Sequence, residues 1–123
     1  MSNRFFGGNG FTLIEVLIGL VILAIGVLAI AGMQVTSIRG TSFSNNLNHA
    51  SILAQRGLES LKGLQTSDPK LDTGNYPNDI NIGIFNGGYS AARNPNYVLI
   101  KYTVSWLEKE TTHSVSFSTI KSR

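Results

Sequence analysis

Cysteine is absent from the 123 residues of this chain, so neither a disulfide framework nor a thiolate metal site can form. Charge is also scarce, because charged residues make up 14% of the sequence and an ordinary soluble domain has about a quarter. Ten basic and seven acidic side chains give a net charge of +3, with no run of one sign. The basic face or stripe that nucleic-acid binding requires is therefore missing. The length fits one domain.

The segment from Phe11 to Met33 lacks proline and has one charged residue, Glu15. As a helix that rises about 1.5 Å per residue, it would reach roughly 35 Å, enough to cross a bilayer core. Its apolar residues lie all round the helix, as in a helix that faces lipid or is fully buried. Residues 11–33 are therefore predicted to form a transmembrane helix.

Two other interpretations of this segment are weaker. A secretory signal peptide has an apolar core of about 7–15 residues, which is shorter than this run, and a more basic start than Arg4 alone provides. A plain membrane anchor leaves Glu15 unexplained, since a carboxylate in a membrane helix is costly and points to a function.

The string Gly10-Phe11-Thr12-Leu13-Ile14-Glu15, followed by about twenty apolar residues, resembles the prepilin signature of type IV pilins and type II secretion pseudopilins. The resemblance covers residues 10–33. It implies that a prepilin peptidase removes residues 1–10 as a leader, cuts between Gly10 and Phe11, and methylates the new amine of Phe11. It also implies that Glu15 is the family's glutamate five residues into the mature chain.

The sequence departs from the family pattern at two positions. Asn9 precedes Gly10 where most leaders have lysine or arginine, and Gly32 stands where many major pilins have a helix-kinking proline. Of the nearby glycines, only Gly10 precedes an aromatic residue in register with Glu15. The pattern GLVILAIGVLAIAGMQ resembles minor pilins of the PilV type and I-type pseudopilins, which favours a minor subunit.

Three residues of the apolar segment are predicted to act in assembly. Cleavage creates an amine on Phe11, which could pair with Glu15 of a neighbouring subunit, because an unpaired buried carboxylate is very unfavourable. Gly19 and Gly26 are seven residues apart and share one helix face, where small residues permit close approach of helices.

Residues 34–66 are predicted to continue the helix, now as the amphipathic helix of a head, to about Gln65. Gly40 and Gly57 each weaken it by roughly 1 kcal/mol relative to alanine, and the residue before Pro69 ends it. The apolar residues of its stripe recur every three or four positions: Phe43, Leu47, Ala50, Leu53, Ala54, Leu58, Leu61 and Leu64.

Residues 67–123 are predicted to form a loop region and a small antiparallel sheet of three or four strands. Residues 68–96 are rich in Asn, Gly, Asp and Pro and indicate a loop, with one short strand at Ile80, Ile82 and Ile84. Strict alternation predicts a strand over 98–106 and another from Val115 to Ile120, joined by a turn. The predicted fold class is α+β, with a long N-terminal helix packed against this sheet in a pilin-like layout.

The sequence offers no catalytic constellation, so no enzyme activity, cofactor or metal site is predicted. His49 and His113 have no partner at metal-ligand spacing and are interpreted as exposed polar residues. Three aspartates, Asp68, Asp72 and Asp79, miss the spacing of a calcium loop.

Two further patterns also have structural interpretations. The glycine-rich run 83–88 has no following lysine or helix and is interpreted as a turn rather than a phosphate-binding loop. Alternation places Tyr102 and Trp106 in the core. Tyr76, Tyr89 and Tyr97, together with Trp106, are the residues that would form an aromatic binding surface.

The sequence thus predicts a minor type IV pilin that helps to assemble or prime a pilus. Its expected partners are the prepilin peptidase, major and minor pilin subunits, the assembly platform of the inner membrane, and membrane lipid, with no clear nucleic-acid or small-molecule ligand. It would wait in the bacterial inner membrane as a single-pass protein with a periplasmic head, then enter a pilus or pseudopilus. The alternatives are a type II secretion pseudopilin, a major pilin, and a tip adhesin whose residues 67–96 contact a surface, DNA, sugar or calcium.

Overall fold

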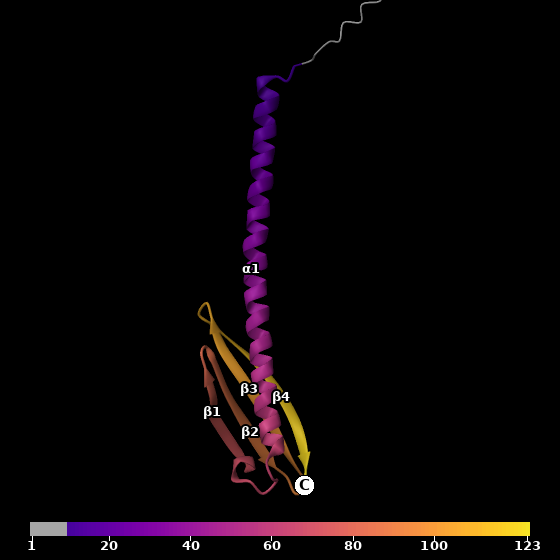
Figure 1. Cartoon of the computed structure of the whole chain (residues 1–123), viewed down its shortest axis with the longest axis vertical. Helices are drawn as coiled ribbons and strands as arrows, with labels where there is room; N and C mark the ends of the chain where they lie inside the picture. The colour runs from indigo at the N-terminus through magenta and orange to yellow at the C-terminus, as the bar shows by residue number, and fades with distance from the viewer. Residues whose placement is uncertain (1–9) are drawn as a thin grey trace, which may run out of the picture. The chain divides into compact units, whose positions relative to one another are not determined.

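A computed structural model describes residues 10–123 of the chain. The predicted leader therefore lies, apart from Gly10, outside the described residues, as do Arg4 and Asn9. The elements follow in the order α1 (Leu13–Gly63), a 3-10 helix (Pro69–Leu71), β1 (Gly74–Ile82), β2 (Phe85–Arg93), β3 (Tyr97–Glu108) and β4 (Thr111–Ser122) (Figure 1). Two compact units divide the chain between Thr41 and Ser42, and each is described by itself.

The helix predicted from Phe11 to about Gln65 is confirmed as α1, which begins and ends two residues inside those bounds. Thr12 caps its N-terminus, because the Thr12 hydroxyl accepts a hydrogen bond from the Glu15 backbone N–H at 3.3 Å. A threonine followed three residues later by glutamate is the sequence of a capping box. The start of α1 is thus encoded within the same short string that carries the family resemblance.

In the second unit, residues 42–63 of α1 lie against one face of a four-stranded antiparallel sheet of order β1-β2-β3-β4 (Figure 1). The α+β prediction is confirmed. Inward residues of the sheet alternate with exposed ones, most regularly along β3. The buried core is shared between the helix stripe, the sheet and one residue of the 3-10 helix: Ala50, Ala54, Leu61, Leu71, Tyr89, Ala91, Val98, Ile100, Tyr102, Val104 and Trp106.

The hairpin of β3 and β4 agrees with its prediction and extends further at both ends. Its two-residue turn consists of Lys109 and Glu110, both with positive φ, at 47° and 66°. Two positive φ values in succession are the geometry that matches the right-handed twist of antiparallel strands. Pairing is unbroken from Glu108 opposite Thr111 to Tyr97 opposite Ser122.

The prediction of a loop over 68–96 was wrong for most of that range, because it contains β1 and β2. Three residues of β1 between Tyr76 and Ile80 lie where the pairing register shifts, and Gly88 of β2 faces this irregularity. A Cβ on Gly88 would lie 2.9 Å from the carbonyl oxygen of Tyr76. The glycine that indicated a loop is thus required by a bulged strand pair, where backbones approach closely.

The glycine-rich run 83–88 is likewise only partly a turn. Gly83 has a φ of +61° and lies with Ile84 between β1 and β2, so Ile84 belongs to the turn and not to a strand. Gly87 lies within β2, where a Cβ would come 3.2 Å from the ring of Tyr102. Pro77 is tolerated in β1 because this strand is at the edge of the sheet.

Candidate functional site

The predicted cleavage site lies just before the first turn of α1. Gly10 and Phe11 are outside the helix and exposed, and the Phe11 side chain is 83% accessible. No described residue covers a Cβ built on Gly10. A short non-helical segment that ends at a capped helix leaves the Gly10–Phe11 peptide bond accessible to a protease.

Glu15 lies in the first turn of α1. At this position its carboxylate is next to the unpaired N–H groups of the helix terminus and interacts favourably with the helix dipole. The structure therefore gives Glu15 a role within its own chain, which sequence reasoning missed. The signal was available in the spacing Thr12-x-x-Glu15, the capping-box pattern.

Gly19 and Gly26 lie on the same helix, and among the described residues nothing comes within 4 Å of a Cβ built on either one. No packing within the described chain requires glycine at these positions. Each glycine nevertheless costs a helix about 1 kcal/mol relative to alanine. Nothing in residues 10–123 therefore accounts for glycine at either position.

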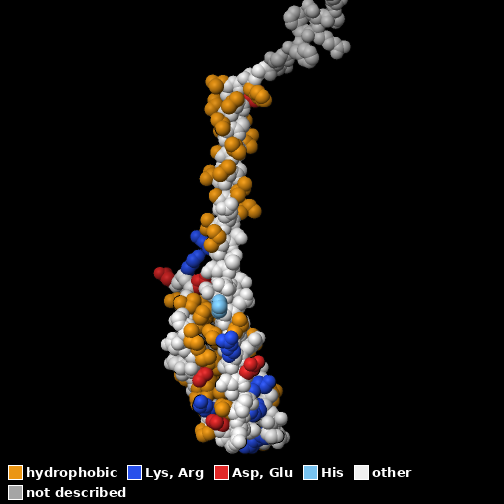
Figure 2. Space-filling model, in the orientation of Figure 1, with side chains coloured by type: hydrophobic (Ala, Val, Ile, Leu, Met, Phe, Trp, Pro, Cys, Tyr) orange, Lys and Arg blue, Asp and Glu red, His pale blue; other side chains and the backbone are white. Residues whose placement is uncertain are grey.

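The apolar side chains around these glycines are exposed, and Figure 2 shows them along the N-terminal part of α1 on the face that it draws. By length and composition, α1 is suited to crossing a membrane. The window that meets this criterion has none of its residues buried. This segment therefore presents apolar surface that is covered by nothing in the described chain.

The three aspartates of the second unit each make a structural contact. The side chain of Asp68 accepts a hydrogen bond from the Lys70 backbone N–H at 2.9 Å, and Asp72 forms an ion pair with Arg93 at 3.0 Å. Asp79 accepts a hydrogen bond from the Tyr102 hydroxyl at 2.8 Å. Within residues 10–123 no group of three potential metal ligands comes together.

The aromatic residues do not form a common exposed surface. Tyr102 and Trp106 are buried as predicted, and Tyr89 is buried too, stacked on Tyr76 with ring centroids 4.6 Å apart. Burial and the hydrogen bond to Asp79 raise the pKa of Tyr102 above its usual value. Burial also raises the pKa of Tyr89. Tyr97 is the exposed tyrosine of the four.

The two histidines differ in their surroundings. His49 is exposed on α1, as predicted. His113 is half-buried instead of exposed, because its ring packs at 5.1 Å against Phe43 and 5.6 Å against Trp106. The alternation of β4 places His113 on the inward face, which the sequence prediction had not considered.

Comparison with known proteins addresses the N-terminal segment. Residues 8–31 match the family model described as the prokaryotic N-terminal methylation motif. The chain carries a type IV pilin-like prepilin signal. No curated protein and no solved structure matches the chain.

This prepilin signal supports a pilin-like or pseudopilin-like subunit and describes a structural motif, not an enzyme family. It implies processing by a prepilin peptidase and assembly with other pilin subunits. Together with the apolar part of α1, it is consistent with anchoring in a membrane and with a place in a pilus.

Proposed function

We propose that this chain is a minor type IV pilin that is cut after Gly10, methylated on the amine of Phe11, and built into a filament through its N-terminal helix. The observation that carries the proposal is the prepilin signal at the start of an apolar helix with no cover in the described chain. Residues 1–10 are then the leader, 11–33 the membrane and filament-core segment, 34–66 the amphipathic helix, and 67–123 the rest of the head.

In the membrane the subunit is a single-pass protein with its head in the periplasm. The positive charge of the leader, from Arg4, fits a cytoplasmic N-terminus. In the filament, Gly19 and Gly26 let neighbouring helices approach closely, and this supplies the contact that their open surroundings lack.

Glu15 pairs with the methylated amine of Phe11 in a neighbouring subunit and so sets the axial register of addition. The pair is favourable chiefly because a carboxylate buried without a partner is very unfavourable. Cleavage and assembly are then linked, since the amine exists only after the Gly10–Phe11 bond is cut.

Because Glu15 also lies in the first turn of its own helix, two variants are needed to test this pairing. Glu15→Gln keeps a side chain that suits a capping box but removes the charge, whereas Glu15→Ala removes both. Incorporation into sheared filaments is measured by immunoblot in the producing cells, with membrane levels as the reference. Both variants are expected to lose incorporation. Normal incorporation of Glu15→Gln would contradict the pairing, because it would show that the charge of Glu15 is not needed for assembly.

A pseudopilin of a type II secretion system is the alternative, because it would use the same N-terminal features. Deleting the gene separates the two: loss of surface pili supports the pilin role, and loss of exoprotein secretion with normal pili supports the pseudopilin role. A tip subunit with a binding role is a second candidate, supported by the polar row Asn75, Ser90, Lys101 and Ser118 on the face of the sheet that points away from α1.

A further inference from the structure

The face of the sheet that points away from α1 is covered by hydroxyl and amide side chains. One row crosses all four strands at a single level, because Asn75 is paired with Ser90, Ser90 with Lys101, and Lys101 with Ser118. The inward neighbours Tyr89 and Ile100 are buried in the core. The row is therefore a continuous polar band on the outer surface.

A second row of the same kind crosses the sheet nearer the hairpin turns. It consists of Asn81, Asn86, Ser105 and Ser114, each paired with the next. The Ser105 hydroxyl donates to the carbonyl oxygen of Asn86 at 3.3 Å. All four side chains end in an amide or a hydroxyl, which both donate and accept hydrogen bonds.

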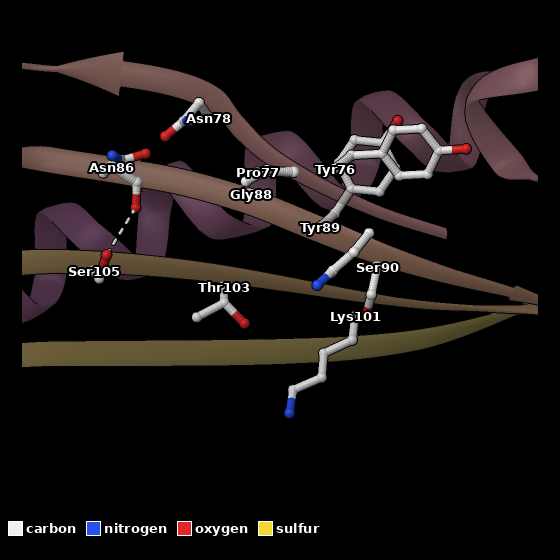
Figure 3. A pocket seen from close by; sticks show the side chains of 11 residues that line it. Tyr76, Pro77, Asn78, Asn86, Gly88, Tyr89, Ser90, Lys101, Thr103 and Ser105 are labelled. Carbon is white, nitrogen blue, oxygen red and sulfur yellow. Dashed lines mark hydrogen bonds between the residues drawn. The ribbon is translucent and has the colours of Figure 1, made fainter. Parts of the chain in front are cut away.

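Between the two rows lies a shallow hollow of about 250 Å³. It lies above Gly88, which has no side chain and is paired with Thr103 of β3. The Thr103 hydroxyl is 2.8 Å from that of Ser116, which continues the polar surface onto β4. Figure 3 shows Thr103, Ser105 and Lys101 on the strands around this hollow. The hollow is open to solvent on the outer surface of the sheet.

Lys101 is the single charged side chain in the two rows and at the hollow. It is exposed, and the ion pair found within residues 10–123 joins Arg93 to Asp72, not Lys101 to an acid. No acidic residue lines the hollow. The surface thus presents one positive charge surrounded by neutral hydrogen-bonding groups, which is complementary to a ligand with many hydroxyls and an occasional carboxylate.

An apolar row borders the first polar row. Ala92, Leu99 and Ile120 are paired across β2, β3 and β4, and the last two are 40% and 63% exposed. This border provides a surface for the C–H faces of sugar rings. A single lysine does not make a basic stripe for nucleic acid, and the two polar rows contain no aromatic anchor of the kind that protein interfaces favour.

From this arrangement we propose that the outer face of the sheet binds an acidic polysaccharide, with a uronate carboxylate at Lys101 and sugar hydroxyls along the two polar rows. This binding function goes beyond a role in assembly and does not depend on processing of the N-terminus. It requires only the second unit of the chain, residues 42–123.

The test uses the full chain in detergent micelles and measures binding of polygalacturonate, with dextran as the uncharged polymer. Lys101→Gln removes the charge at the hollow, and Lys109→Gln removes one charge at the β3–β4 turn as its matched control. Thr103→Val removes a hydroxyl from the hollow, and Thr111→Val does so beside the turn. Fluorescence of the single tryptophan, Trp106, verifies that each variant is folded.

Polygalacturonate is expected to bind more tightly than dextran. Lys101→Gln should weaken binding by about tenfold or more, as expected for a lost charge-assisted hydrogen bond, and Thr103→Val by about fivefold. Both control variants should bind as the natural chain does. The proposal is overturned if polygalacturonate does not bind, if Lys101→Gln binds normally, or if Lys109→Gln weakens binding equally. These outcomes leave the cleavage site and the assembly role untouched.

Discussion

Gly26 and Gly57 lie on the same helix in opposite surroundings. A Cβ on Gly57 would overlap the ring of Tyr102, whereas a Cβ on Gly26 would meet nothing within 4 Å among the described residues. Packing within the second unit therefore accounts for the glycine at position 57. In the described part of the first unit, residues 10–41, no side chain packs against the glycines and the apolar surface is exposed. The proposed function supplies partners for the described part of the first unit, namely lipid and neighbouring subunits.

The largest expected effect comes from adding one methyl group at Gly57, and the same substitution at Gly26 is the comparison. Gly57→Ala should lower the free energy of unfolding of the second unit by about 1–3 kcal/mol, because the core must shift to accept the new atom. Gly26→Ala should leave it unchanged within about 0.5 kcal/mol. Denaturant unfolding of the full chain in micelles, followed by Trp106 fluorescence, measures both. Equal effects of the two variants would contradict the claim that Gly57 is packed against the core whereas Gly26 is not.

Tyr102→Phe tests the polar contact beneath the sheet bulge. Loss of the hydroxyl leaves Asp79 without its donor and should cost about 1–2 kcal/mol of unfolding free energy. Tyr97→Phe is the control, since Tyr97 is exposed and belongs to the same residue type. The same denaturant titration serves, and a control that is destabilised as strongly would argue against a specific Tyr102–Asp79 contact.

The dependence of unfolding free energy on alkaline pH is a second test of the buried Tyr102 side chain. The pKa of Tyr102 is raised in the folded chain, so the unfolded chain releases this proton first as the pH rises. The stabilising contribution is complete below a pH of about 10 and declines progressively as the pH rises from there toward the raised pKa of the folded chain. Unfolding free energy should therefore fall as the pH rises above about 10, and fall less steeply in Tyr102→Phe. Parallel profiles for the two proteins would contradict the buried neutral phenol.

The smallest expected effect concerns the C-terminal end of α1. The Lys121 ammonium donates hydrogen bonds to the carbonyl oxygens of Lys62 and Leu64, at the negative end of the helix dipole. Lys121→Met should cost about 0.3–1 kcal/mol, and less at high salt. Lys101→Met is the charge-matched control, and its unfolding midpoint should stay at the value of the natural chain.

The sequence was sufficient to predict the features that depend on local pattern. The length of α1, the β3–β4 hairpin and the burial of Tyr102 and Trp106 follow from periodicity and turn residues, and the structure confirms them. The prepilin signal was recognisable from six residues and is supported by the match over residues 8–31.

Features that depend on contacts between distant residues could not be predicted in this way. The Tyr102–Asp79 hydrogen bond and the contacts of Lys121 join residues that are 23 or more positions apart. In β1 and β2 the bulge requires glycine and accepts proline, which locally indicate a loop. From the sequence, Gly57 was interpreted only as a residue that weakens the helix. The reason for glycine at this position is the ring of Tyr102, which lies in β3 and is distant in the sequence.

The most direct test of the central claim is mass spectrometry of the mature N-terminus, from protein isolated with its native prepilin peptidase. The account predicts a chain that begins at Phe11 with one methyl group on its α-amine, and a Gly10→Val variant that stays uncut. A mature protein that still begins at Met1, or that is cut at a bond other than Gly10–Phe11, would contradict it.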